Sequence, residues 1–310
     1  MKISIVTPCF NEEENVAECA RRVKKVLEEH LSSFDYEHIF VDNSSSDGTS
    51  LVLKELAESD SKIKVIVNSR NVGPFRNMWI GMRHATGDIL VPMVPADLQD
   101  PPEIIPLLVQ QWENGYLVVY GIRKNREESL LMRIIRKLYY KAITKFSDEI
   151  IPVSAGEFML LDRKVVNSFI NIDDHYPYIR GLVAQTGVRS AEVKYTWVKR
   201  HKGKSKNNFL DLIDQGINGF ISTSRVLLRF SLLLGVLFGL VGFAAAILTF
   251  VNAIRTPDAF SFGMPTLIIS FFILSGLQLV FLGIIGEYLL SVHRQVRKQP
   301  EVFAIEKHNF

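Results

Sequence analysis

The first two-thirds of the chain alternates short apolar runs with longer, mixed or charged stretches. Short runs rich in β-branched residues predict strands, and the stretches between them have the composition of helices. The expected strands are Lys2–Thr7, His38–Val41, Ile63–Val67 and Ile89–Val94. The expected helices run from Glu13 to about His30 and over Leu51–Ala57. Strands separated by helices imply an α/β domain with a mainly parallel sheet and right-handed crossovers.

Two long stretches without a charged residue, Phe230–Ile254 and Ala259–Gly286, lie in the last quarter of the chain. A helix of about 20 apolar residues spans the ~30 Å hydrocarbon layer of a bilayer. Two buried helices of a soluble core are the alternative, but charge-free runs of this length seldom occur twice in one soluble domain. We therefore predict two transmembrane helices within residues 230–290, joined by a short external loop at 252–263.

Basic residues flank the outer ends of both predicted spans. They are Arg225, Arg229, Arg294, Arg297 and Lys298. Cytoplasmic flanks are enriched in such residues, so the pattern predicts an integral protein of the plasma or inner membrane. A cytoplasmic domain at 1–206, an interfacial juxtamembrane helix at 207–229 and a cytoplasmic tail at 291–310 complete the expected organisation. No signal peptide precedes the first predicted strand.

Composition excludes several classes of protein. The 310 residues carry 36 Lys and Arg against 33 Asp and Glu, and this small net charge of +3 argues against a nucleic-acid partner bound through bulk charge. The two cysteines, Cys9 and Cys19, have neither the pattern of a disulfide framework nor the spacing of a metal site. Hydrophobic residues make up 47% of the chain, which excludes a disordered protein.

Polar residues follow each of the four predicted strands. The segments are 8–15, 42–49, 68–73 and 96–102. Any one of them could simply cap the next helix. The carboxyl ends of parallel strands meet at one edge of a sheet, however, and open α/β sheets bind ligands at that edge. The four segments together therefore predict one binding site.

The residue types in these segments indicate a nucleotide diphosphate ligand. Glycine-rich phosphate loops are absent, and acidic residues take their place. Asp42 can accept a hydrogen bond from a base or a ribose. Asp97 and Gln99 can hold Mg²⁺ or Mn²⁺ through oxygen, and such an ion would neutralise a diphosphate.

These segments also resemble a known family. Pro-Cys-Phe-Asn-Glu-Glu-Glu-Asn at 8–15, Val-Asp-Asn-Ser-Ser-Ser-Asp-Gly-Thr at 41–49, Arg-Asn-Val-Gly at 70–73 and Ala-Asp-Leu-Gln-Asp-Pro-Pro-Glu at 96–103 are similar to family-2 glycosyltransferases. The resemblance extends from about Lys2 to Lys206 and implies a Rossmann-like domain of GT-A fold. It is stronger to the polyprenyl-phosphate branch, which includes relatives of dolichyl-phosphate mannose synthase and bacterial undecaprenyl-phosphate glucosyltransferases.

The resemblance implies roles for individual residues. The donor nucleotide sugar would be held by Pro8, Asn11, Glu12, Asp42, Asn71 and Asp97, and the metal by Asp97 and Gln99. The acceptor phosphate would be held by Arg123, Arg133, Arg163, Arg200, Ser205 and Lys206. Asp97 and Glu157 would be the catalytic residues. A basic amphipathic segment, Leu130–Phe146, is predicted to lie at the membrane interface or to pack on the sheet.

Two positions depart from the family pattern. Pro95 stands where the family has the first acid of its metal motif, which leaves Asp97 as the remaining carboxylate. Glu157 stands where the family usually has Asp, so the charge is kept and one methylene is added. Glu157 is expected to orient the acceptor or to stabilise positive charge on the sugar, rather than to act as a strong base.

The resulting functional prediction is the inverting transfer of a hexose from a UDP-sugar to polyprenyl phosphate, with glucose as the first expectation. A phosphate monoester is mostly dianionic at neutral pH and is already a nucleophile, so the enzyme must mainly hold two anions together. GDP-mannose and an aminopentose donor are alternatives, and a homo-oligomer is left open.

Three other classes of protein are alternatives to this function. A processive polysaccharide synthase would carry a Gln-x-x-Arg-Trp segment, and a nucleotidyltransferase would carry a glycine-rich loop after the first strand. The chain has neither. A degenerate membrane scaffold is suggested by Pro95 but disfavoured by Asp97, Gln99, Arg200 and Lys206.

Overall fold

The computed structural model describes residues 1–124, 155–172, 177–198, 200, 226–255, 263–296 and 303–310. They divide into two compact units. The first unit contains a β-sheet with its covering helices and includes the C-terminal residues. The second unit contains two long helices.

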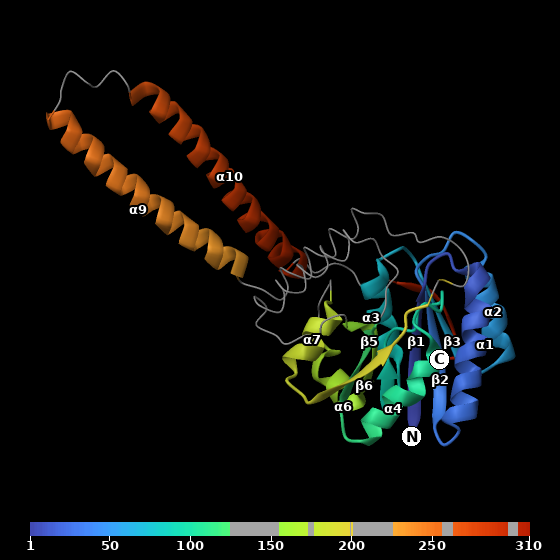
Figure 1. Ribbon diagram of the computed structural model, residues 1–310. Coiled ribbons are helices and arrows are strands. Elements are labelled where there is room, and N and C mark those ends of the chain that lie inside the picture. The colour runs from blue at the N-terminus through green and yellow to red at the C-terminus, as the bar shows by residue number, and fades with distance from the viewer. Residues whose placement is uncertain (125–154, 173–176, 199, 201–225, 256–262, 297–302) are drawn as a thin grey trace. The chain divides into compact units, whose positions relative to one another are not determined.

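The first unit is built on one sheet of eight strands (Figure 1). The strands are β1 (Lys2–Cys9), β2 (Asp35–Asp42), β3 (Ile63–Asn68), β4 (Ile89–Val91), β5 (Val118–Arg123), β6 (Ala155–Asp162), β7 (Ser190–Tyr195) and β8 (Ala304–His308). The helices are α1 (Glu13–His30), α2 (Thr49–Ser59), α3 (Pro74–His84), the 3₁₀ helix η1 (Pro102–Ile104), α4 (Ile105–Glu113), α6 (Arg163–Phe169) and α7 (Ile179–Gln185). The four predicted strands and both predicted helices of this unit are confirmed.

The order of strands in the sheet is β7-β5-β6-β4-β1-β2-β3-β8. Strand β1 pairs in parallel with β2 and β4, as do β2 with β3 and β5 with β7. Strand β6 runs antiparallel to both β4 and β5, and β8 runs antiparallel to β3. The prediction of an α/β domain with a mainly parallel sheet is confirmed, although the two reversed strands were not predicted.

Helices cover both faces of the sheet because its strands alternate buried side chains between the faces. On β1, Ile3 and Ile5 enter a core with α1, α2 and α4, whereas Val6 enters a second core with α3, α6 and α7. Val16 and Val23 are two turns apart and lie on the same buried face of α1. The unit therefore has three layers, and the loops at the strand ends are left for binding.

The last strand comes from the far end of the chain. Strand β8 pairs with the edge strand β3, where Val65 faces His308. Asn309 has a left-handed backbone (φ 62°), and its side-chain Nδ2 donates to the carbonyl oxygens of Ala57 at 2.7 Å and Ile63 at 2.8 Å. The segment predicted as a cytoplasmic tail, 291–310, therefore supplies an edge strand to the sheet domain.

The second unit consists of α9 (Val226–Arg255) and α10 (Gly263–Val296). Within the described residues, one segment, Ile273–Leu290 of α10, is long and apolar enough to cross a membrane, and none of it is buried in the protein. Helix α9 contains a shorter apolar stretch, Ser231–Ala245. The two long helices agree with the predicted helical pair, but two membrane spans are not established. Residues 207–225 and 256–262 lie outside the described residues.

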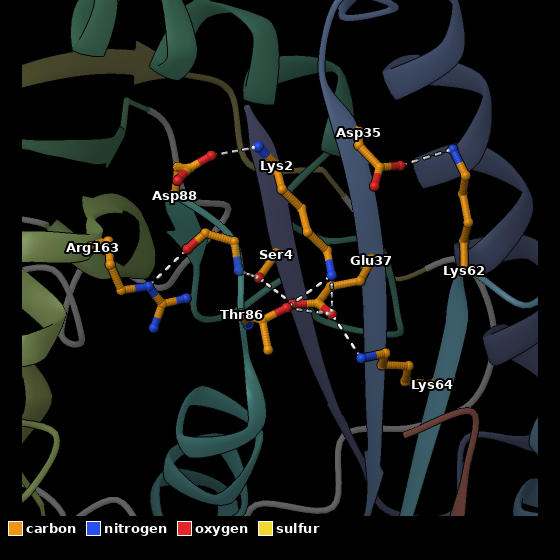
Figure 2. A network of polar contacts seen from close by, with 10 residues as sticks. Lys2, Ser4, Asp35, Glu37, Lys62, Lys64, Thr86, Asp88 and Arg163 are labelled. Atoms are coloured by element: carbon orange, nitrogen blue, oxygen red, sulfur yellow. Dashed lines mark hydrogen bonds and ion pairs between the residues drawn. The ribbon is translucent and has the colours of Figure 1, made fainter.

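A buried acid ties the amino ends of the central strands together (Figure 2). The Glu37 side chain on β2 is 2% exposed. Its carboxylate accepts hydrogen bonds from Ser4 Oγ and the Thr86 backbone N–H, both at 2.6 Å, and ion-pairs with Lys2 Nζ at 2.8 Å and Lys64 Nζ at 2.9 Å. Burial alone would raise the pKa of Glu37, but these donors lower it to about 2.

Replacing this carboxylate should cost stability in a pH-dependent way. We expect Glu37→Gln to lower the free energy of unfolding by about 3 kcal/mol at pH 7, because the pKa falls from 4.5 to about 2 on folding. A lowered pKa contributes stability that is complete above pH 4.5 and is lost as the pH falls toward 2. Chemical unfolding at pH 7 and pH 3 should therefore show a smaller difference between variant and wild type at pH 3.

The matched control is Glu58→Gln on α2, where the side chain is exposed. It should change the free energy of unfolding by less than about 0.5 kcal/mol at either pH. An equal loss for Glu37→Gln at both pH values would mean that packing, and not the charge of Glu37, provides the stability.

Candidate functional site

The carboxyl ends of β1, β2 and β4 meet at one edge of the sheet, as the polar segments predicted. Asp42 is the last residue of β2 and lies opposite Cys9 of β1 in the register. The loop after β1 is joined to the loop after β2, because Asn11 Oδ1 accepts from the Ser46 backbone N–H at 2.7 Å and the Asn11 backbone N–H donates to Ser45 Oγ at 2.8 Å. Three of the predicted donor-site residues, Pro8, Asn11 and Asp42, thus belong to one place.

Arg200 lies between two acids of this edge. Its guanidinium forms an ion pair with Glu12, and Nη1 is 3.5 Å from Asp97 Oδ2. All three side chains are less than one-fifth exposed. The approach of Arg200 is supported by a backbone hydrogen bond from Val198 N–H to the Gln99 carbonyl at 3.1 Å. A residue expected at the acceptor phosphate therefore lies beside two residues expected at the donor.

Backbone strain is concentrated at the same edge. Asn11, Ser44 and Leu98 have left-handed backbones, with φ of 55°, 62° and 61°. Leu98 is also buried, and a branched side chain in this region is uncommon. Each of the three follows a different strand of the central sheet, so the loops after β1, β2 and β4 are all held in tight turns. Such strain persists where surrounding structure enforces it, and it is frequent in ligand sites.

Asp42 and Asp97, the two aspartates at this edge, have raised pKa values, whereas the pKa of Glu37 is lowered. Burial raises the pKa of Asp42, even though Ser45 Oγ donates to its Oδ1 at 2.5 Å. Its other oxygen, Oδ2, is buried without a hydrogen-bond partner among the described residues. Burial also raises the pKa of Asp97, and the nearby Glu12 carboxylate adds to the effect. Both carboxylates are costly to charge as they stand, so each would gain from a donor or a cation supplied by a ligand.

A divalent ion at this edge would take most of its ligands from the bound substrate. The described residues contain no group of three His, Cys, Asp or Glu side chains that could hold a metal ion. Asp97 Oδ1 accepts from the Gln99 backbone N–H at 3.2 Å, and Pro95 has no side-chain oxygen to offer. Mg²⁺ is commonly held by one or two carboxylates together with substrate phosphates, and the residues present fit that arrangement.

Asn71, also expected at the donor, shapes a turn. Its Oδ1 accepts from Asn43 Nδ2 at 2.8 Å and from the Gly73 backbone N–H at 2.9 Å. Gly73 has φ 82°, a conformation that suits glycine, and it directly precedes α3. The structure therefore gives Asn71 a role in holding the loop after β3 against the loop after β2.

The direction of β6 places Glu157 and Arg163, both predicted to act at the site, at opposite edges of the sheet. Because β6 is antiparallel to β4, Glu157 near its start lies toward the edge where β4 ends, and Glu157 Oε1 is 2.8 Å from Arg180 Nε. Arg163 follows the end of β6 and lies at the opposite edge, where its Nε donates to the Gly87 carbonyl at 2.7 Å (Figure 2). This placement does not suit a phosphate ligand at the site, and we leave Arg163 out of it.

Arg123 is engaged by an acid that the sequence analysis did not assign. Its Nε and Nη2 donate to the two oxygens of Asp100 at 2.8 and 2.5 Å, and the Tyr195 hydroxyl donates to Asp100 Oδ1 at 2.5 Å. Asp100 lies in the 96–103 string, which was the available signal, whereas neither Tyr195 nor Arg180 had one. Arg133, Ser205 and Lys206, and the predicted helix over 130–146, lie outside the described residues.

Comparison with known proteins shows what the chain is similar to. Residues 4–169 match the domain described as Glycosyl transferase family 2. An uncharacterized glycosyltransferase of Synechocystis sp. is 34% identical over 97% of this chain and 93% of its own length. A prophage bactoprenol glucosyl transferase homolog of Escherichia coli is 31% identical over 97% of each chain, and the bactoprenol glucosyl transferase of Shigella phage SfX is 30% identical over 97% of each.

Among solved structures, glucosyl-3-phosphoglycerate synthase from Mycobacterium tuberculosis, in complex with Mn²⁺, UDP and phosphoglyceric acid, is similar to part of the chain. The alignment has 20% identity and a TM-score of 0.49, and it covers 69% of this chain and 73% of the synthase.

Proposed function

The chain belongs to glycosyl transferase family 2, and from that premise we propose that it transfers a hexose from a nucleotide diphosphate sugar to polyprenyl phosphate. The observation that carries the proposal is the cluster at the carboxyl edge, where Asp42 and Asp97 have raised pKa values and Arg200 lies beside Asp97. Relatives named bactoprenol glucosyl transferase, similar over nearly the whole chain, support the lipid acceptor and favour glucose.

The proposed donor is a UDP-sugar. Asp42 Oδ2, buried without a partner among the described residues, is suited to accept a hydrogen bond from the base N–H of the nucleotide. Pro8 lies near the end of β1, beside Cys9, which is opposite Asp42 in the register, and Asn11 and Glu12 lie in the loop that follows. GDP-mannose and an aminopentose nucleotide are the competing donors, because no described residue reads the sugar itself.

The proposed cofactor is Mg²⁺ or Mn²⁺, held by Asp97 and Gln99 together with the donor diphosphate. When bound, the ion would neutralise the charge of the leaving diphosphate. Asp97 must be ionised to bind a cation. Because its pKa is raised, it becomes ionised at a higher pH than an ordinary aspartate does.

In the proposed reaction, an oxygen of the acceptor phosphate bonds to the anomeric carbon as the bond from that carbon to the diphosphate breaks. The nucleoside diphosphate leaves with the electron pair, and attack from the opposite side inverts the configuration. Arg200 would hold the acceptor phosphate, with Ser205 and Lys206 as further proposed contacts. Glu157, oriented by Arg180, would face the positive charge that develops on the sugar.

We also propose that α9 and α10 anchor the enzyme in the plasma or inner membrane as a hairpin, with the sheet domain in the cytoplasm. Large apolar side chains are exposed along both helices, including Leu240 and Phe243 on α9 and Phe271 and Leu279 on α10. Exposed apolar surface of this extent marks a site of interaction with a membrane or a protein. Because the proposed acceptor is a lipid, we infer that the bilayer buries these side chains.

The function is tested by supplying membranes that contain the protein with labelled UDP-glucose, other UDP-sugars, GDP-mannose and a nucleotide-linked aminopentose. Polyprenyl phosphate is added, and the organic phase is extracted. We expect labelled lipid from UDP-glucose at more than ten times the yield from GDP-mannose. Label in the organic phase from another nucleotide sugar would change the donor, and no lipid-linked product from any of them would reject the proposal.

A further inference from the structure

Asp100, Arg123 and Tyr195 form a buried polar unit behind the site. Asp100 is 2% exposed and accepts two hydrogen bonds from Arg123 and one from the Tyr195 hydroxyl. The Arg123 Nε is also 3.3 Å from the Tyr195 hydroxyl. Burial and the Asp100 carboxylate raise the pKa of Tyr195, so its hydroxyl stays protonated and continues to donate. The two-pronged contact of a guanidinium with a carboxylate is the most directional ion pair that side chains make.

The unit joins segments that are far apart in the sequence. Asp100 lies three residues after Asp97, Arg123 ends β5, and Tyr195 ends β7 and leads directly toward Arg200. The Val198 backbone N–H donates to the Gln99 carbonyl at 3.1 Å, between the two functional residues. These contacts tie the loop that carries Asp97 to the segment that carries Arg200.

The guanidinium of Arg123 also lies next to Trp197 and Gly156. It lies over the ring of Trp197, with 5.6 Å between the guanidinium carbon and the ring centroid. On its other side it borders Gly156, where a Cβ would lie 3.4 Å from Arg123 Nη2, an ordinary contact distance. The two hydrogen bonds to Asp100 and the contact with Trp197 together hold the Arg123 guanidinium in place.

We propose that Asp100, Arg123 and Tyr195 are positioning residues that fix Asp97 and Arg200 relative to each other. The proposal rests on the roles given to Asp97 and Arg200 in the proposed function.

The test removes the Tyr195 hydroxyl, which donates to Asp100. We expect Tyr195→Phe to lower kcat/KM for polyprenyl phosphate about tenfold. The matched control is Tyr116→Phe, because the Tyr116 hydroxyl also contacts an arginine, Arg189 at 3.4 Å, at the other end of the same pair of strands. The control should change kcat/KM less than twofold. Asp100→Asn provides a second variant if Tyr195→Phe does not fold.

A double-mutant cycle separates positioning from general stability. If Tyr195 acts through Arg200, the tenfold loss should shrink to less than threefold in an Arg200→Ala background. A purely structural role would leave the two losses multiplicative, and so would an independent contact of this unit with substrate. Either result would overturn the proposal.

A second readout does not depend on turnover. With 5-fluorotryptophan in place of tryptophan, the ¹⁹F resonance of Trp197 should shift or broaden in Tyr195→Phe, while those of Trp79 and Trp112 stay unchanged. The affinity for Mn²⁺ and UDP, which the proposed function assigns to Asp97, should fall severalfold. If wild type transfers no sugar to polyprenyl phosphate but both changes occur, the proposed function fails and the positioning role stands. An unchanged Trp197 resonance would overturn the positioning role.

Discussion

Asp97→Asn should lower kcat about a thousandfold while leaving the protein folded. The amide is nearly the same size as the carboxylate, and its oxygen can still accept from the Gln99 backbone N–H. The substitution removes the negative charge of Asp97, the one carboxylate that the metal motif retains beside Pro95. Removing a charged group that stabilises developing charge typically costs a hundred- to a thousandfold, and loss of the metal adds to this. The measurement is single-turnover formation of the lipid-linked sugar in detergent.

The matched control for this variant is Asp88→Asn, because Asp88 directly precedes β4 whereas Asp97 lies in the loop after it. Asp88 Oδ2 accepts from the Lys2 backbone N–H at 2.8 Å at the opposite edge of the sheet. It should change kcat less than twofold. EDTA should inactivate wild type as fully as Asp97→Asn does, and Mn²⁺ should restore it. Full activity of wild type in EDTA would remove the metal from the mechanism.

The parts of the site that could be predicted are those that depend on local pattern. A short apolar run followed by a polar segment marks a strand and its carboxyl end, and parallel strands bring those ends to one edge. Asp42 and Asp97 follow this rule, and both lie where it predicts. The same rule located Pro8, Asn11 and Glu12. None of this required knowing how distant segments pair.

The direction of β6 could not be predicted, because period-2 burial is the same for a parallel and an antiparallel strand. All eight residues of β6 are buried, so even the alternation is lost. Glu157 and Arg163 are six positions apart in sequence, and the resemblance gave both of them roles at the site. An extended strand of that length carries them to opposite edges of the sheet, as the pairing of Ile89 with Asp162 requires.

Contacts across long separations were equally invisible. Arg200 and Glu12 are 188 positions apart, and β8 joins the sheet from beyond two long helices. Strand β8 has only two apolar residues, Ala304 and Ile305, followed by three polar ones, so its formation depends on the open edge of β3. The Asp100–Arg123 pair likewise unites a loop and a strand end that local patterns treat separately.

Arg200→Ala should raise KM for polyprenyl phosphate and lower turnover, for a combined loss in kcat/KM of roughly ten- to a hundredfold. The loss of one charge-assisted phosphate contact costs about 1.5–3 kcal/mol, which corresponds to that range. Arg200 also lowers the pKa of Asp97, so its removal should raise that pKa further. Asp97 must be ionised for metal binding, and the acidic limb of the pH–rate profile should therefore move to higher pH.

Two further variants test whether the effect is specific to the Arg200 guanidinium. Arg200→Lys should recover only part of the activity, because an ammonium keeps the charge but loses the planar fork. Arg22→Ala removes a surface ion pair with Glu103 and should change kcat/KM less than twofold. Calorimetry with Mn²⁺ and UDP at neutral pH should give nearly the wild-type affinity for Arg200→Ala, since Asp42 and Asp97 remain. If that affinity is lost while KM for the lipid is unchanged, Arg200 binds the donor diphosphate, and its place beside Glu12 and Asp97 reflects that role instead.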